Sequence, residues 1–166
     1  MDRAAVELRW CSVDLLRAIA TAERAPDWAP DFPDDIDRGV AQRFLELHEA
    51  GVGPEFPFGP FVIVDLAKGV VVGSIGAHGN PINGEVEIGY DVIKSERGRG
   101  IATAAILSLT ATLSAEPGVE VIVARVARHN TPSARALLAA GFVQRPAAPT
   151  VGFDAFELVA SPSVEH

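Results

Sequence analysis

The sequence predicts a single α/β domain over residues 1–166, in which a mixed, mostly antiparallel sheet is flanked by about four helices. Three observations favour this fold. The chain length suits one hydrophobic core. Its 48% apolar and 22% charged residues are typical of a packed globule. Segments with the period of a strand or a helix follow one another in the order β-α-α-β-β-β-α-β-α-β-β.

The first part of the chain predicts one strand and two helices. Apolar residues alternate with charged ones over residues 6–10, as in a half-buried strand. Two helices are expected over residues 13–25 and 36–50, separated by a proline-rich loop. The residues expected to begin or end these helices are Ser12, Pro26, Asp34 or Asp35, and Gly51.

The middle of the chain predicts three strands and a helix. Residues 61–66 and 70–77 are rich in β-branched side chains and form a predicted hairpin. A third strand, residues 85–93, follows the tight-turn pair Asn83-Gly84. A helix is expected from about residue 98 to 115.

The last part of the chain predicts a buried strand, a helix and two short strands. Residues 119–126 form an almost continuous apolar run, which is expected to lie parallel to the strand at 85–93 because a helix connects them. Thr131 is predicted to cap the next helix, with Pro132 at its first position and Gly141 at its end. Short strands are expected around residues 142–145 and 153–159.

Composition argues against several classes of protein. A net charge of −8 disfavours nucleic-acid binding and suits an amine substrate, or it serves solubility alone. The first residues lack a secretory signal and no apolar run is long enough to cross a membrane, so a cytoplasmic protein is expected. Cys11 is predicted to be a small buried hydrophobe, and the scattered histidines predict no metal site.

A glycine-rich turn leads directly into the helix predicted near residue 98. Such a turn favours anion binding, because the first helical amides lack partners and the helix dipole is positive there. A P-loop would need a lysine after the glycines, which is absent. The dinucleotide-binding pattern would need a third glycine where Thr103 stands. The pattern that fits is R-x-x-G-x-A, from Arg97 to Ala102.

With this motif, the sequence resembles the GNAT superfamily of acetyl-coenzyme-A-dependent N-acetyltransferases. The stretch "EIGYDVIKSERGRGIATAA" is similar to the family's coenzyme-binding motif, and "ARHNTPSARALLAAGF" is similar to its second motif. The element order also matches, so the resemblance covers nearly the whole chain. The second motif is most similar to the branch that acetylates ribosomal-protein N-termini.

The resemblance implies a site for acetyl-CoA. In the family, the strand before the glycine turn parts from its parallel neighbour, so backbone groups at Tyr90, Asp91 and Val92 are expected to bind the pantetheine arm. Near Val92 an amide is expected to polarise the thioester carbonyl. The expected cofactor-binding residues are Tyr90, Asp91, Val92, Arg97, Gly98, Arg99, Gly100, Ile101, Ala102, Thr103, Asn130 and Ser133.

Some of these residues also have a plain structural interpretation. The amides around the glycines, with the charges of Arg97 and Arg99, are expected to hold a pyrophosphate, although both arginines suit a solvated surface as well. Asn130 suits a contact with pantetheine or a helix cap.

The resemblance also implies the catalytic groups. Glu87 matches the family carboxylate near the amine and is expected to act as the base, although a surface carboxylate is the alternative. Many relatives carry a tyrosine where this chain has Leu137. This leaves Ser133, a water molecule or no dedicated acid to protonate the thiolate.

The acceptor is expected to lie among the first two helices, their loop and the hairpin. Trp28, Phe32, Glu85 and His78 are the candidate substrate-binding residues, although core packing explains the aromatic ones equally well. The predicted function is transfer of an acetyl group from acetyl-CoA to a primary amine by direct attack. A non-catalytic acyl-CoA sensor or interaction domain is the alternative.

Several properties are left open by the sequence. The amine partner is a small molecule or a protein N-terminus, and a ribosomal protein, an antibiotic, a polyamine and an amino acid all fit. The acyl-chain preference is also open. A homodimer is compatible with an exposed edge strand near the end of the chain.

Overall fold

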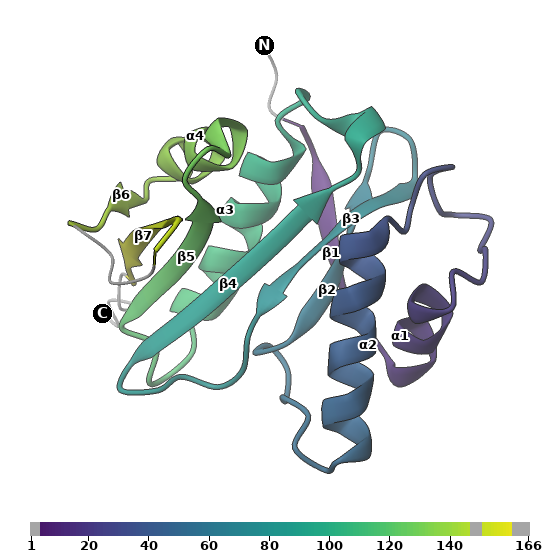
Figure 1. Cartoon of the computed structure of the whole chain (residues 1–166), viewed down its shortest axis with the longest axis horizontal. Coiled ribbons are helices and arrows are strands. Elements are labelled where there is room, and N and C mark those ends of the chain that lie inside the picture. Colours follow the sequence, from purple (N-terminus) through teal and green to yellow (C-terminus); the bar gives the residue numbers. More distant parts are fainter. Residues whose placement is uncertain (1–3, 147–150, 161–166) are drawn as a thin grey trace.

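The computed structural model describes residues 4–146 and 151–160 (Figure 1). The strands are β1 (Val6–Trp10), β2 (Pro60–Asp65), β3 (Val70–Ala77), β4 (Glu85–Val92), β5 (Val121–Ala127), β6 (Val143–Gln144) and β7 (Phe153–Val159). The helices are α1 (Val13–Ala20), α2 (Asp35–Glu49), α3 (Ile101–Ser114) and α4 (Thr131–Ala139), with a short 3-10 helix η1 (Lys94–Glu96). This order is the predicted one. Part of the predicted link between the last two strands, residues 147–150, lies outside the described residues.

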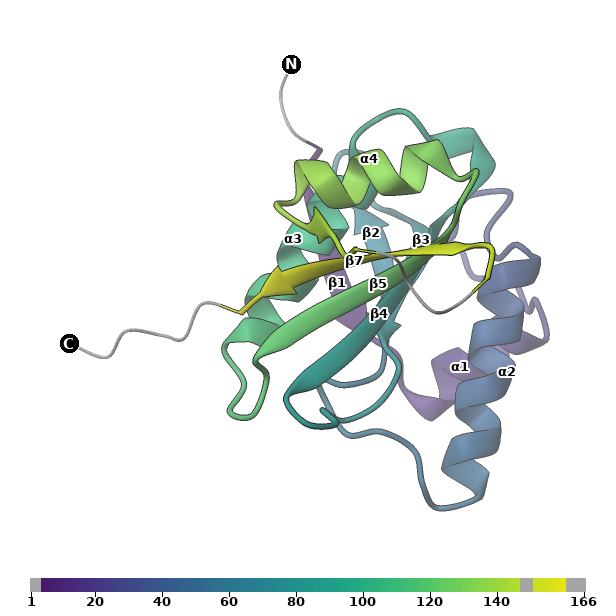
Figure 2. The same ribbon diagram turned by 60° about the vertical axis from the view of Figure 1, so that its left-hand side comes forward.

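The described strands form one sheet in the order β1-β2-β3-β4-β5-β7-β6. β4 and β5 are parallel, as predicted, and the other neighbours are antiparallel. Figure 2 shows β4, β5 and β7 side by side. β6 is an edge strand with Val143 60% exposed, and the homodimer stays a prediction.

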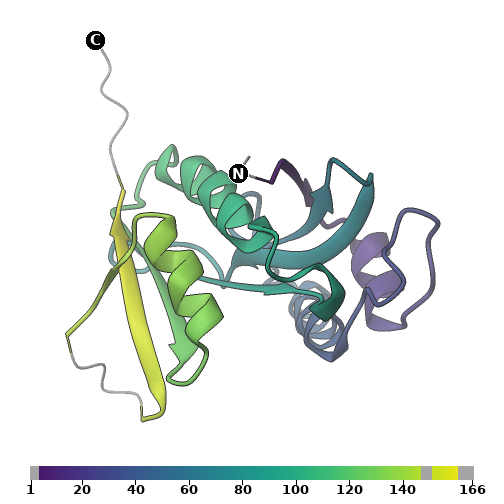
Figure 3. The same cartoon turned by 90° about the horizontal axis from the view of Figure 1, so that it is seen from above.

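Helices cover both faces of this sheet. Figure 3 shows α3 and α4 on one side of it and α1 and α2 on the other. α3 packs against β1, β3, β4 and α4, and α1 packs against α2. Large side chains are fully buried at this centre: Ile63, Ile88, Ile106, Leu109, Leu113, Ile122 and Leu137. None of the described helices combines the length and apolar composition that a membrane crossing needs.

Local sequence sets most helix boundaries. The Ser12 side chain accepts a hydrogen bond from the amide of Leu15 and caps α1, as predicted. Asp34 and Asp37 form a reciprocal capping box at the start of α2. Gly51, with φ of 74°, follows the end of that helix.

Two predicted boundaries are wrong. α1 ends at Ala20, well before Pro26, because the chain turns at Ala22, where φ is 53°. The cap of α4 is Asn130, whose side chain accepts from the amide of Ser133, so Thr131 is already helical. Cys11 is buried as predicted, and burial raises the pKa of its thiol to about 12, which makes it unreactive.

Candidate active site

β4 and β5 part halfway along their length. Their parallel pairing ends at Ile88 opposite Ala124. Beyond that point β5 continues against β7 as far as Ala127, while β4 continues against β3 as far as Val92. Figure 1 shows the two strands diverging. The structure therefore contains the splayed parallel pair that the family resemblance implied.

The ladder between β3 and β4 determines which backbone groups face this gap. The amide of His78 donates to the carbonyl of Glu87 over 2.8 Å. Antiparallel ladder bonds recur at every second residue, so Gly89 and Asp91 also turn their backbone groups toward β3. The intervening residues, Tyr90 and Val92, turn theirs toward the gap. Asp91 thus differs from the expectation that its backbone faces the coenzyme.

The turn before α3 leaves the first amides of the helix open. Gly98 and Gly100 have φ values of 80° and 78°, which side-chain-bearing residues rarely adopt. A β-carbon at either position would meet no atom within 4 Å. Gly100 is the N-cap and offers no side chain to the helical amides. These amides and the positive end of the dipole fit a diphosphate.

A cavity of about 570 Å³ lies at this helix start, beside the gap and α4. It is lined by Tyr90, Val92, Glu96, Arg97, Gly98, Gly100, Ile101, Ala102, Thr103, Asn130, Pro132, Ser133, Arg135, Ala136 and Ala139. The structure therefore brings together all the predicted cofactor residues except Asp91 and Arg99. Asn130 caps α4 and also lines the cavity, and its contact with pantetheine stays a prediction.

The two predicted arginines differ in their surroundings. Arg97 lines the cavity and donates from Nε to the carbonyl of Val92 over 2.9 Å. Arg99 is directed away, because its guanidinium binds Asp65 over 2.8 Å and also binds Glu96. Both carboxylates are buried, and they hold the pKa of Arg99 above its ordinary value through these hydrogen bonds. The Arg99 side chain is thus used within the fold.

A second cavity of about 220 Å³ lies on the opposite face of the sheet, between α2 and the strands. Its lining residues are Ile36, Val40, Phe44, Pro60, Ser74, Ile75, Gly76, His78, Gly89, Tyr90 and Asp91. Tyr90 lines both cavities. The two cavities therefore lie on either side of Tyr90, near the point where β4 leaves β5.

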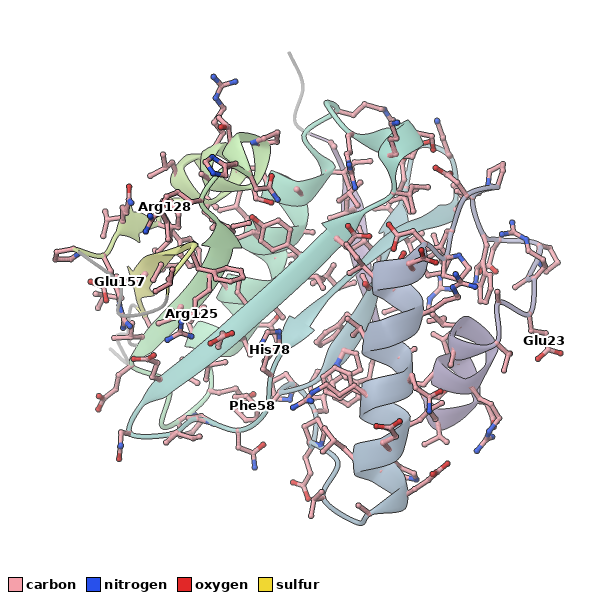
Figure 4. The ribbon with its side chains drawn as sticks, viewed as in Figure 1. Glu23, Phe58, His78, Arg125, Arg128 and Glu157 are labelled. Atoms are coloured by element: carbon pink, nitrogen blue, oxygen red, sulfur yellow. The ribbon has the colours of Figure 1, made fainter. Side chains whose placement is uncertain are left out.

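Three side chains form a hydrogen-bonded chain next to the smaller cavity. Glu87 accepts from Arg125 with one carboxylate oxygen, and its other oxygen is 3.1 Å from Nδ1 of His78. Figure 4 shows His78 and Arg125 on the two flanks of β4. Desolvation lowers the pKa of His78, and the charges of Arg43 and Arg125 lower it further. His78 is therefore neutral near pH 7.

Asp91 belongs to a group of carboxylates at the start of α2. Asp34, Asp37 and Asp91 each bring one oxygen within 4.8 Å of the others, an arrangement that could hold a metal ion. The positive end of the α2 dipole opposes a cation there. Burial raises the pKa of Asp37 to about 7, and burial together with the hydrogen bond to Asp34 raises that of Asp91 to about 8. That the protein uses no metal stays a prediction.

Three predicted substrate residues lie away from both cavities. Trp28 and Phe32 are core residues, 5% and 0% exposed, with ring centroids 5.2 Å apart. Burial of these large apolar rings in the core is more favourable than their exposure in a solvent-filled groove, because it removes more apolar surface from water. Glu85 lies at the start of β4 and binds Arg145 over 2.9 Å. Of the four, His78 lines the smaller cavity.

Some lining residues were not predicted. On α4 the additional positions are Pro132, Arg135, Ala136 and Ala139, and on α2 they are Ile36, Val40 and Phe44. Both sets repeat at helical spacing, so each covers one face of its helix. That periodicity was the available signal, and it indicates a shared helix face without indicating a cavity.

Comparisons with known proteins agree with this geometry. The family model of the acetyltransferase (GNAT) domain matches residues 6–143. No curated protein matches the chain significantly.

Many solved structures are similar. A RimL ribosomal L7/L12 α-N-protein acetyltransferase in complex with coenzyme A is 18% identical with a TM-score of 0.64, covering 93% of each chain. A chimera of the spermidine N-acetyltransferase SpeG from Vibrio cholerae and hSSAT is 17% identical with a TM-score of 0.65, covering 93% of this chain and 95% of that one. The putative acetyltransferase yncA from Salmonella typhimurium, solved with acetyl-CoA, is 18% identical with a TM-score of 0.63, covering 97% of each chain.

Proposed function

The chain belongs to the GNAT acetyltransferase family, and from this premise we propose that it transfers an acetyl group from acetyl-CoA to a primary amine by direct attack. The acceptor is a small-molecule amine or a protein N-terminus. The observation that carries the proposal is that Tyr90 separates two cavities and lines both, one beside an open helix start and one on the opposite face of the sheet. A donor and an acceptor can thus approach one another through the gap between β4 and β5.

The larger cavity is the proposed site of acetyl-CoA. The amides of residues 101–103 hold the pyrophosphate, and Arg97 adds a positive charge beside them. Arg135, which also lines the cavity, supplies a second charge that the sequence alone did not indicate. Backbone groups of Tyr90 and Val92 face the gap and pair with the pantetheine arm.

Acetyl transfer also needs a neutral amine, a polarised thioester and a proton for the sulfur. The amide of Val92 faces the gap and can donate to the thioester carbonyl. Glu87 is the proposed general base, and it removes a proton from the amine through an intervening group. Ser133 lines the larger cavity and is the proposed acid, and a thiolate is a sufficiently good leaving group to need little help.

A non-catalytic acyl-CoA sensor is the second candidate. The observation in its favour is Leu137, which is fully buried where many relatives carry a tyrosine. Such a protein would bind acetyl-CoA with the same cavity and release no thiol in the presence of any amine.

The experiment has a binding arm and a transfer arm. Calorimetry measures acetyl-CoA binding to the wild type, Gly100→Glu and Gly118→Glu. Both glycines have positive φ and open surroundings, but Gly118 lies at the far end of α3. We expect Gly100→Glu to abolish binding, because the side chain puts bulk and negative charge in the phosphate site, and Gly118→Glu to leave binding unchanged.

The transfer arm measures thiol release with spermidine, 2-phenylethylamine, free amino acids and short peptides with free N-termini. Release with any of these amines above the rate of hydrolysis supports the transferase. Tight binding without release from any member of the panel supports the sensor. Equal affinities of the two glycine variants would show that the coenzyme binds elsewhere.

A further inference from the structure

We infer that His78 is the residue that takes the proton from the acceptor amine, and that Glu87 is a positioning residue acting through it. The inference rests on the proposed acetyl transfer and identifies the base that this reaction needs. It changes the role that the family resemblance implied for Glu87.

The carboxylate of Glu87 is already occupied on both oxygens. One oxygen accepts from Arg125 on β5, and the other lies 3.1 Å from Nδ1 of His78. Glu87 lines neither cavity, whereas His78 lines the smaller one. Tyr90 and Asp91 line the same cavity, but burial raises the pKa of both, to about 8 for Asp91, so they hold their protons near neutral pH and the imidazole is the free base there.

The hydrogen bond with Glu87 determines which nitrogen of His78 can act as a base. A carboxylate accepts hydrogen bonds, so the ring proton sits on Nδ1 and the lone pair is on Nε2. A β-carbon placed on Gly89 would lie 2.7 Å from this Nε2. Gly89 is the first residue of β4 beyond the end of its pairing with β5. The lone pair on Nε2 of His78 thus lies beside Gly89, where the gap between β4 and β5 begins.

The charges around His78 keep this nitrogen unprotonated. Arg43 on α2 and Arg125 on β5 act against the imidazolium, and Glu87 on β4 is the one carboxylate hydrogen-bonded to the ring within the described residues. Burial and the two arginines lower the pKa of His78. The imidazole is therefore ready to accept a proton at neutral pH, and Glu87 stabilises the imidazolium once it forms.

The proton balance of the step is complete with these groups. An ammonium substrate gives one proton to Nε2 of His78, and the amine nitrogen forms a C–N bond with the thioester carbon. The C–S bond breaks, the departing sulfur takes a proton from the hydroxyl of Ser133, and Ser133 regains the second proton that the same nitrogen releases. His78 then releases its proton to solvent, so each turnover yields an amide, a thiol and one proton.

The kinetic test compares His78→Gln and Glu87→Gln, with His48→Gln on the exposed end of α2 as control. The probes are acetyl-CoA with 2-phenylethylamine, or the panel amine with the highest kcat/KM. We expect His78→Gln to lower kcat about 100-fold and to remove the acid limb of the kcat/KM profile. Glu87→Gln lowers kcat less and moves this limb to lower pH, because the imidazolium loses its negative partner. Loss of the limb in Glu87→Gln alone would overturn the inference.

A second measurement needs no acceptor. Nitrogen-15 NMR of the wild type with coenzyme A bound reads the tautomer and pKa of His78 directly. We expect a proton on Nδ1 and a pKa below the ordinary histidine value of about 6.5. A proton on Nε2, or a ring that titrates above pH 7, would overturn the inference even if no amine in the panel is acetylated. Failure of acetyl-CoA binding would instead count against the proposed function.

Discussion

The phenolic hydroxyl of Tyr90 on β4 donates a 2.9 Å hydrogen bond to the backbone carbonyl of Ser133 on α4. This bond links the two elements beside the gap, at the point where β4 no longer pairs with β5. Burial raises the pKa of Tyr90, so the hydroxyl keeps its proton and stays a donor. The side chain of Tyr90 therefore links β4 to α4 across the gap. Of the backbone groups of β4 that face the gap, the carbonyl of Val92 accepts from Arg97.

Tyr90→Phe tests this role. The variant keeps the ring but leaves the carbonyl of Ser133 without its donor, so we expect a loss of about 1 kcal/mol in the free energy of unfolding. Urea denaturation measures the change, and an unaltered m-value would show that the folded structure is otherwise kept. A variant as stable as the wild type would mean that this bond does not hold the gap.

Arg97→Gln and Arg99→Gln should differ in their effect on acetyl-CoA affinity. Arg97 lines the larger cavity, so its loss should weaken acetyl-CoA binding about tenfold, as for one charge-assisted hydrogen bond. Arg99 pairs with two buried carboxylates, so its loss should lower the Tm and leave coenzyme affinity nearly unchanged. Calorimetry and thermal unfolding of both variants provide the measurements. Equal effects of the two substitutions on affinity would contradict the difference in their surroundings.

Gly89→Ala should imitate the loss of His78. The backbone of Gly89 lies outside the positive-φ region, so alanine fits the strand, but its β-carbon would stand 2.7 Å from Nε2 of His78 and displace the ring. We expect kcat to fall about 100-fold with unchanged acetyl-CoA affinity. Gly39→Ala is the matched control, because Gly39 is exposed on α2 with open space around it. A fully active Gly89→Ala variant would show that the ring position is not needed.

Much of the fold was predictable because its signals are local. Alternation defined β1 and β4, and Ser12 and Gly51 marked helix boundaries, since caps and turns depend on a few neighbouring residues. The glycine turn before α3 was recognisable for the same reason, and with it most of the larger cavity.

Side-chain partners distant in the sequence were not predictable. Arg99 was expected at the phosphate site, but it binds Asp65, which precedes it by 34 residues. His78 and Glu87 were each assigned a role, yet their contact with one another and with Arg125 depends on the register of three strands. For Trp28 the sequence left a groove and core packing open, and its 5% exposure beside a backbone bridge to Val71 on β3 identifies it as core.

Asp91→Asn should stabilise the protein in a pH-dependent way. One carboxylate oxygen of Asp91 is buried and has no hydrogen-bond partner within the described residues, and burial beside Asp34 and Asp37 raises the pKa of Asp91 to about 8. In the unfolded chain this carboxyl group titrates near pH 3.9. The folded protein binds its proton more tightly, so Asp91 lowers the free energy of unfolding progressively as the pH rises from about 4 to 8. Asparagine removes this cost, and we expect a gain of about 1–3 kcal/mol in the free energy of unfolding at pH 8 that declines toward zero as the pH falls to 4.

Urea denaturation of Asp91→Asn and the wild type at pH 5, 6.5 and 8 measures the trend. Asp35→Asn, whose side chain is 92% exposed at the start of α2, should show no such trend. A loss of stability at pH 8 would mean that Asp91 is ionised and paired in the folded protein.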